Sequence, residues 1–202
     1  MSKIKLTKSE LKKQRDSLKQ FRHYLPTLLL KKQQLQMKIL EVRKELDERL
    51  ERIRAREQSI EKWVGLLADQ GKTLDLKPWV IPSKVTTGMM NIAGANIPFL
   101  KEVIFPGVDY DFYTTPFWVD KAVEELREYM KLFVEVRVLN EQITQLSKEL
   151  RITTQRVNLF EKVKIPECLE NIRRIRIYLG DQQANAVGIS KVAKRKLEVV
   201  AV

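Results

Sequence analysis

Few residues of this 202-residue chain could do covalent chemistry. His23 is the single histidine and Cys168 the single cysteine, so the chain cannot form a disulfide within itself, a His/Cys metal site or a Cys–His nucleophile pair. Asp109 and Asp111 could act as a carboxylate pair, but they stand in a turn-rich stretch where an exposed loop is the simpler interpretation. The sequence also lacks a phosphate-binding Gly-x-x-x-x-Gly-Lys loop and a Gly-x-Ser-x-Gly elbow. We therefore expect no catalytic residue, no cofactor and no metal.

Composition and charge favour long helices over a compact globule. Charged residues make up 32% of the chain and aromatic residues 7%. The formal net charge is +12, so a polyanion, an acidic protein surface or an anionic membrane could each be a partner. The N-terminus has no apolar run typical of a signal peptide, and no stretch approaches the roughly 18 apolar residues that span a bilayer. Any membrane association is expected to come through a partner or the protein surface.

Residues 1–70 are expected to form one long coiled-coil arm. Thr7 and Glu10 have the spacing of a helix-capping box, with Leu6 and Leu11 at the two flanking staple positions. Apolar residues then recur with the seven-residue period of a left-handed coiled coil. The two series are Leu11, Leu18, Leu25, Ile39, Leu46, Ile53, Ile60 and Leu67, and Phe21, Leu28, Leu35, Val42 and Trp63. Gly71 is the expected helix terminator.

Polar residues interrupt this seam. Lys32 occupies one series, and Gln14, Arg49 and Arg56 occupy the other. Their long side chains could extend out of the seam into solvent, or they could fix the register of the coil or face a third chain. Pro26 removes one backbone hydrogen bond within the arm, which predicts a kink.

Residues 71–115 are expected to be a small insertion with short β-strands. Glycine and proline punctuate this segment, and the apolar runs between them have no helical period. The pattern predicts a hairpin with its turn near Gly94. The insertion is too short for an independent core, so it should pack on the end of the coil or on a partner.

Residues 116–180 are expected to form a second arm that pairs antiparallel with the first. Thr115 and Pro116 are typical of an N-cap and a first helical position. The apolar stripe slips in register near Val136 and Leu139, and Pro166 predicts a second kink. Residues 181–202 follow as a basic tail that is partly helical. The fold class is therefore mainly α, with a long antiparallel two-helix coiled coil formed by the terminal arms.

Net positive charge gathers near the two termini. Residues 1–22 hold eight Lys/Arg against two acids, and residues 164–202 hold eight against four. Antiparallel arms of equal length would bring these two segments together, so we expect one basic tip. A solvated tail and a charged contact with a partner both fit this pattern.

Three segments resemble the D subunit of the V-type and archaeal A-type rotary ATPases. They are Leu6–Leu11, Asn91–Pro98, and the block Arg156–Pro166 that leads into Ile172–Arg176. The resemblance covers most of the chain, and the last block is its most specific part. A heptad alone is shared by many coiled coils, whereas two long arms with this insertion and these segments are far more specific.

The resemblance implies a central rotor shaft without catalytic activity of its own. In this family both termini enter a ring of alternating catalytic A and B subunits, whose ATP hydrolysis turns the shaft. The F subunit packs on the coil, and a funnel-shaped C subunit (named d in eukaryotes) links its foot to the membrane ring. Ion flow, of protons or sodium, can drive ATP synthesis in reverse. Such a subunit would be peripheral, on the cytoplasmic side of a membrane.

Two sets of contact residues follow as hypotheses. The basic tip would meet the catalytic ring through Lys8, Lys12, Lys13, Arg15, Lys191, Lys194, Arg195 and Lys196. The middle of the coil would meet the F subunit near Arg49, Arg56, Met130 and Phe133. The alternative function is a basic coiled-coil protein that binds nucleic acid, or a scaffold. No recognition motif or aromatic stacking platform accompanies the basic clusters, which argues against nucleic acid.

Overall fold

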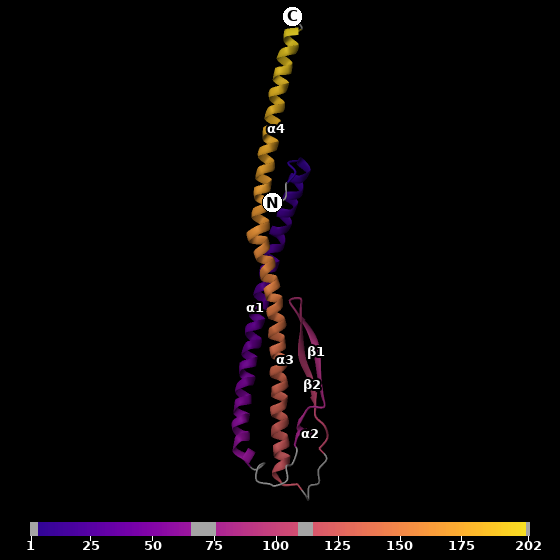
Figure 1. The fold of residues 1–202 in the computed structure, drawn as a ribbon, viewed down its shortest axis with the longest axis vertical. Coiled ribbons are helices and arrows are strands. Elements are labelled where there is room, and N and C mark those ends of the chain that lie inside the picture. The colour runs from indigo at the N-terminus through magenta and orange to yellow at the C-terminus, as the bar shows by residue number, and fades with distance from the viewer. Residues whose placement is uncertain (1–3, 66–75, 109–114, 201–202) are drawn as a thin grey trace. The chain divides into compact units, whose positions relative to one another are not determined.

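The computed structural model describes residues 4–65, 76–108 and 115–200, with the backbone alone for 197–200. The elements are α1 (Lys8–Val64), α2 (Lys77–Val80), β1 (Lys84–Ile92), β2 (Ala95–Ile104), α3 (Trp118–Asn158), the π-helical turn η2 (Leu159–Lys164) and α4 (Ile165–Val200) (Figure 1). The predicted mainly helical fold with a small β-containing insertion is confirmed. Gly71, Asp109 and Asp111 lie outside the described residues.

Internal contacts divide the chain into two units. The terminal unit consists of residues 1–32 and 152–202, and the central unit consists of residues 33–151. The N-terminal and C-terminal arms run antiparallel within each of them. In the terminal unit Gln14 meets Asn171 while Phe21 meets Phe160. In the central unit the later residues of α1 likewise meet earlier residues of α3.

The start of α1 shows half of the predicted capping box. The Glu10 backbone N–H donates to Thr7 Oγ1 at 3.3 Å, so Thr7 is the N-cap. The Glu10 carboxylate does not return to Thr7. It accepts a hydrogen bond from Gln14 Nε2 at 2.9 Å, and the Thr7 N–H donates to the Lys5 carbonyl instead. α1 then continues through Pro26 as one helix.

A π-helical turn, η2, stands just before Pro166, where the sequence predicts a kink. The Ile165 N–H donates to the Phe160 carbonyl, five residues back, where an α-helix would use the fourth. Proline offers no N–H, and its ring crowds the carbonyl four residues before it. Widening the preceding turn relieves that crowding, so the helix continues without a break into α4, which contains Pro166.

The hairpin forms where the sequence predicts it. β1 and β2 pair antiparallel, and the turn between them holds Ala93 at φ 50° and Gly94 at φ 77°. Two positive φ values suit the right-handed twist of a tight hairpin. The Asn91 side chain fixes the turn, because its Oδ1 accepts from the Gly94 N–H at 3.0 Å and its Nδ2 donates to Asn96 Oδ1 at 2.7 Å.

The hairpin packs along the side of the coil and not on its end, contrary to expectation. β1 and β2 lie beside α3 in Figure 1. Ala95 and Ile97 of β2 are buried among residues of both arms. The buried partners are Leu35, Ile39 and Val42 of α1 and Leu139 and Leu146 of α3. Gln142 of α3 adds a hydrogen bond from its Nε2 to the Pro98 carbonyl at 2.6 Å. Leu139, near the predicted slip of register in α3, lies in this cluster and contacts the hairpin, a third packing partner.

A second cluster lies around the start of α3. Leu76 and Val80 pack against Val119, Ala122 and Val123, with three tryptophans partly buried around them. α3 begins at Trp118, two residues after the predicted Pro116. The Val119 N–H bonds the Pro116 carbonyl at 3.0 Å, so a turn precedes the helix.

Candidate functional site: the cross-arm seam and the charged surfaces

Two arginines of the seam are held by carboxylates on the opposite arm of the central unit. Arg49 Nε donates to Glu135 at 2.6 Å, and Arg56 donates to Glu125 at 2.5 Å and to Glu128 at 2.9 Å. The hydrogen bond from Arg56 to Glu125 raises the pKa of the guanidinium. Each contact exists at one register of the two helices only. Of the three roles that the sequence leaves open for these residues, the cross-arm pairs favour fixing the register of the coil.

Next to these pairs, Tyr129 of α3 donates its hydroxyl to Glu57 of α1 at 2.9 Å. Burial and this carboxylate raise the pKa of the Tyr129 hydroxyl, so it stays a hydrogen-bond donor at neutral pH. The bond adds a further contact between the arms at a defined position.

The four residues predicted to meet the F subunit differ in how accessible their side chains are to a partner. Arg49 and Arg56 are engaged in the cross-arm pairs. Met130 packs against the cluster at the start of α3. Phe133 keeps 53% of its surface exposed. Of the four, Phe133 is the side chain best placed to contact another protein.

The seam of the terminal unit is polar and aromatic. Asn171 Nδ2 donates to Gln14 Oε1 at 3.4 Å, and the rings of Phe21 and Phe160 lie 5.0 Å apart. Phe160 belongs to η2, so the π-helical turn places this ring against α1. Cys168 is buried nearby, and desolvation, with the neighbouring Glu167 carboxylate, raises the pKa of its thiol. A thiol held in this neutral form is a poor nucleophile.

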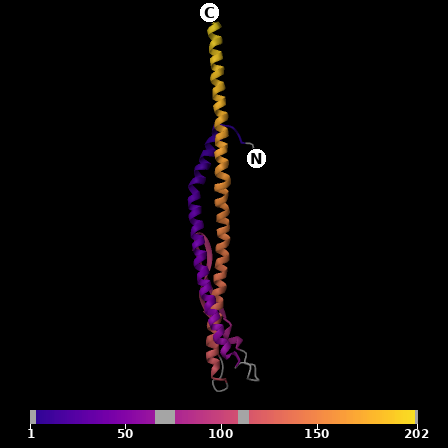
Figure 2. The ribbon, with the colours of Figure 1, turned by 90° about the vertical axis from the view of Figure 1, so that its left-hand side faces the viewer.

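The structure does not gather the predicted basic tip into one place. Lys8, Lys12, Lys13 and Arg15 are exposed on α1, and Lys191, Lys194, Arg195 and Lys196 are exposed on α4. All eight lie in the terminal unit, but α1 begins beside the part of α4 near Asn171. From there α4 rises about 30 Å to Lys191, at about 1.5 Å per residue. In both Figures 1 and 2 α4 continues past the start of α1.

This separation comes from the last segment of α4. Residues 181–202, predicted as a partly helical tail, lie in α4 as far as Val200. Neither Gly180 nor Gly188 interrupts the helix, and every side chain described from Asp181 onward is exposed. The two arms of the terminal unit are therefore unequal, and the final turns of α4 have no partner helix among the described residues.

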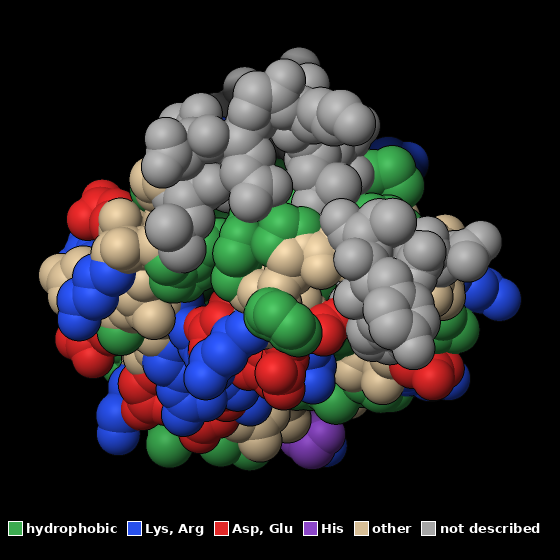
Figure 3. Space-filling view, turned by 90° about the horizontal axis from the view of Figure 1, so that it is seen from below, with side chains coloured by type: hydrophobic (Ala, Val, Ile, Leu, Met, Phe, Trp, Pro, Cys, Tyr) green, Lys and Arg blue, Asp and Glu red, His purple; other side chains and the backbone are tan. Residues whose placement is uncertain are grey.

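Sequence counting located the positive charge but missed a second basic surface. Lys19, Arg22, Arg173 and Arg176 line a groove of the terminal unit together with Arg15. Their spacing along each helix was a readable signal, but the pairing of the two helices was needed to bring them together. Elsewhere the charges mix: in the end-on view of Figure 3, Lys/Arg and Asp/Glu side chains are interspersed.

The described residues contain no group of three His, Cys, Asp or Glu side chains placed to hold a metal ion. Among the helices of the described part, none has a stretch long and apolar enough to cross a membrane. The structure instead shows two antiparallel helical arms, joined by cross-arm ion pairs and hydrogen bonds, with charged side chains exposed on their surfaces.

Comparison with known proteins decides the family. The family model described as the D subunit of ATP synthase matches residues 10–195, which include both arms and the hairpin. The chain belongs to this family. The D subunit of the V-type ATP synthase of Borreliella burgdorferi is 45% identical over 198 residues, covering 98% of this chain and 96% of the relative. The resemblance seen in the sequence is confirmed.

More distant relatives in the same family match over the same length. The D subunit of the V-type ATP synthase of Chlamydia caviae is 34% identical over 197 residues, covering 98% of this chain and 95% of the relative. That of Chlamydia muridarum is 32% identical over 200 residues, covering 98% and 97%. The match therefore spans nearly the full length of this chain and of these relatives.

Proposed function

We propose that this D subunit is the central rotor shaft of a V/A-type rotary ATPase or ATP synthase. It transmits torque between ATP hydrolysis or synthesis in a ring of A and B subunits and ion translocation, of protons or sodium, in a membrane ring. The observation that carries the proposal is the family match over residues 10–195, which spans both helical arms. The chain acts without catalytic residues of its own.

Resistance to twisting supports this role. A single helix bends and twists readily, whereas two helices held side by side by specific contacts resist bending and twisting together. In the central unit these contacts are the Arg49–Glu135 and Arg56–Glu125 pairs and the buried cluster around Leu35 and Leu146. Sliding one arm past the other would break charge-assisted hydrogen bonds and expose the buried cluster together.

Asymmetry supports it as well. One shaft inside a threefold ring meets three equivalent sites with three different faces, so it can bias each site toward a different conformation by differential contacts. The hairpin packs along the coil in the central unit, and η2 changes the winding of one arm in the terminal unit. In the described part of the N-terminal arm, α1 is α-helical throughout and has no π-helical turn to match η2.

The proposed partners are the A and B subunits around the terminal unit, the F subunit on the coil and, at the foot, the funnel-shaped C/d subunit. The basic residues Lys8, Lys12, Lys13, Arg15, Lys191, Lys194, Arg195 and Lys196 would face the ring. The surface around Phe133 would face the F subunit. The chain would be peripheral, on the cytoplasmic side of the membrane, and joined to it through the complex.

Site-specific cross-linking tests the proposal. In a Cys168→Ala background, Lys12→Cys or Lys194→Cys carries a benzophenone that is activated by light in the purified complex. We expect the shaft to join the A or B subunit, and ATP hydrolysis to fall in proportion to the cross-linked fraction, because a fixed shaft cannot turn. The Cys168→Ala parent, without an engineered cysteine, is the matched control. Full hydrolysis in cross-linked complexes would exclude a turning shaft.

A further inference from the structure

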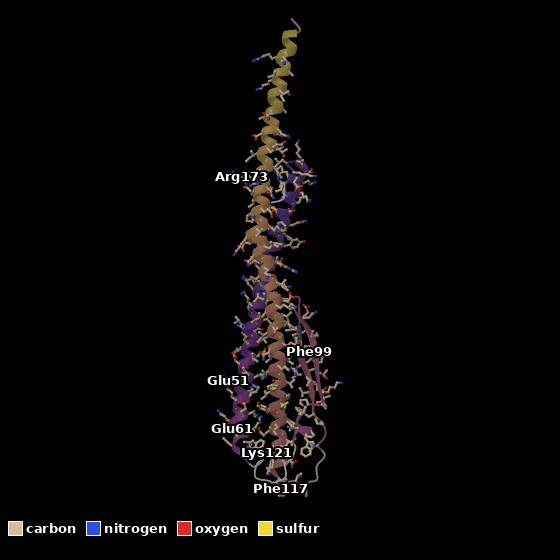
Figure 4. The ribbon with its side chains drawn as sticks, viewed as in Figure 1. Glu51, Glu61, Phe99, Phe117, Lys121 and Arg173 are labelled. Carbon is tan, nitrogen blue, oxygen red and sulfur yellow. The ribbon has the colours of Figure 1, made fainter. Side chains whose placement is uncertain are left out.

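The terminal unit carries a groove whose walls are cationic and whose floor is apolar. It has a volume of about 420 Å³. It is lined by Arg15, Leu18, Lys19 and Arg22 of α1 and by Leu169, Ile172, Arg173 and Arg176 of α4. Figure 4 marks Arg173 on α4.

The two walls repeat one helical spacing. Within each set of four, the later residues follow the first by three, four and seven positions, which places all four on one face of an α-helix. On α1 the apolar Leu18 lies between the cations, and on α4 the apolar Leu169 and Ile172 precede them. Ile172 is 7% exposed and Leu169 is 44% exposed, so the floor is partly open to solvent.

The positive charge of the groove is not balanced by its lining. Five of the eight lining residues are lysine or arginine, and none is acidic. Among the described residues, no carboxylate lies within ion-pair distance of any of the five, whereas Arg174 on the same helix bonds Glu170 at 3.0 Å. Closely spaced like charges repel one another, and the groove concentrates a positive potential that a bound anion would relieve.

We propose that this groove binds a carboxylate-rich segment of a catalytic-ring subunit, with one apolar side chain of that segment on the floor. The proposal rests on the proposed function, and it moves the main ring contact from the predicted tip to the paired part of the arms. Arginine binds carboxylates with two parallel hydrogen bonds, and the four arginines line both walls.

The floor selects a protein segment over other anions. Leu18, Leu169 and Ile172 would gain nothing from a bare phosphate, whereas they would bury an apolar side chain. No aromatic residue lines the groove, so the stacking surface typical of single-stranded nucleic-acid sites is missing from the lining. An acidic loop or helix end with one apolar residue could pair its carboxylates with the cationic walls and bury its apolar side chain against the floor.

Carbodiimide cross-linking of the purified complex tests this assignment, because the reagent joins an amine directly to a touching carboxylate. Lys19 supplies the amine of one wall, and Arg173→Lys adds an amine to the other. Arg174→Lys adds one on the same helix outside the groove and is the matched control. Lys19→Arg keeps the charge but removes the amine. The joined peptides are identified by mass spectrometry.

We expect Lys19 and the lysine at position 173 to join Asp or Glu of the same segment of the A or B subunit. The Lys19 product should disappear in Lys19→Arg, and Arg174→Lys should give no product with that segment. If A and B copurify but only lysines outside the groove react with them, the groove assignment is wrong and the shaft function stands. If A and B do not copurify, both fail.

A binding measurement gives a second readout. Replacing Arg173 and Arg176 by glutamine should weaken retention of the shaft in the ring about tenfold at low salt, since each exposed pair contributes modestly. The salt dependence should flatten as well. Arg174→Gln should leave both unchanged, and the far-UV circular dichroism of every variant should match the parent. Equal effects of the groove and control variants would overturn the proposal.

Discussion

Replacing Ile97 by alanine should loosen the hairpin from the coil. Ile97 is completely buried between the two arms and shares its cluster with Leu35 and Leu146. The change removes three carbon groups, worth about 2.4 kcal/mol of transfer free energy at about 0.8 kcal/mol each. A residual cavity adds to this loss, so the total for such truncations is about 2–5 kcal/mol.

The assay is urea unfolding followed by far-UV circular dichroism, combined with hydrogen exchange. Exchange should accelerate in residues 84–104 and at the buried face of residues 35–42, because these segments share one cluster. Met89→Ala is the matched control, since Met89 lies on β1 with 66% of its surface exposed. It should change the unfolding free energy by about 0.5 kcal/mol or less.

Two results would refute the reasoning behind this prediction. One is an unfolding free energy for Ile97→Ala within about 0.5 kcal/mol of the parent, the range of an ordinary surface substitution. The other is faster exchange in the hairpin alone, with residues 35–42 unaffected, which would show that the hairpin does not pack on α1.

Three further predictions concern the seams and the helix start. A double-mutant cycle with Arg49→Ala and Glu135→Ala should give a coupling of about 0.5–1 kcal/mol that shrinks in 1 M salt; a zero coupling at low salt would deny the pair a role in register. Cys168 should react with a thiol reagent at pH 8 far more slowly in the folded protein than in urea. The pKa of this thiol in the folded protein lies above its ordinary value of 9.0, so the neutral thiol contributes its full stability below pH 9.0. This contribution is lost as the pH rises from 9.0 through the folded pKa. An unfolding free energy that stays constant over this pH range would contradict the prediction. Thr7→Ala should cost about 1 kcal/mol and speed exchange of the Glu10 amide, whereas Thr7→Ser should preserve the cap.

The sequence predicts the local features of this fold well. The seven-residue period locates the arm, and the buried α1 residues Leu35, Ile39, Val42 and Ile53 all belong to the predicted series. The Thr7 cap and the Gly94 turn are likewise set by residues close in the chain. The heptad period, the cap and the turn each depend on residues that lie close together in the sequence.

Features that depend on distant residues were not predictable in this way. The packing of Ile97 along the coil depends on which faces of α1 and α3 remain uncovered, and the sequence does not encode that locally. η2 depends on how a continuous helix accommodates Pro166, which short-range patterns do not specify. The continuation of α4 through Gly188 shows that intrinsic propensity is a weak prior, since one glycine costs only about 1 kcal/mol.

The candidate site shows the same division. Counting charges identifies the terminal unit as basic, and that conclusion needs no structure. The separation of Lys191 from Lys8, and the groove that joins Arg15 to Arg173, depend on where one helix lies beside another. One contact in that alignment is the hydrogen bond from Asn171 to Gln14, two residues that are 157 positions apart in the sequence.

Single-molecule rotation tests the central claim most directly. The catalytic ring is fixed to a surface, and a bead is attached to the shaft through Arg54→Cys, an exposed position of α1, in the Cys168→Ala background. A rotor shaft predicts that the bead turns in one direction when ATP is supplied and stops when ATP is removed. A bead that stays still while the same ring hydrolyses ATP would contradict the account.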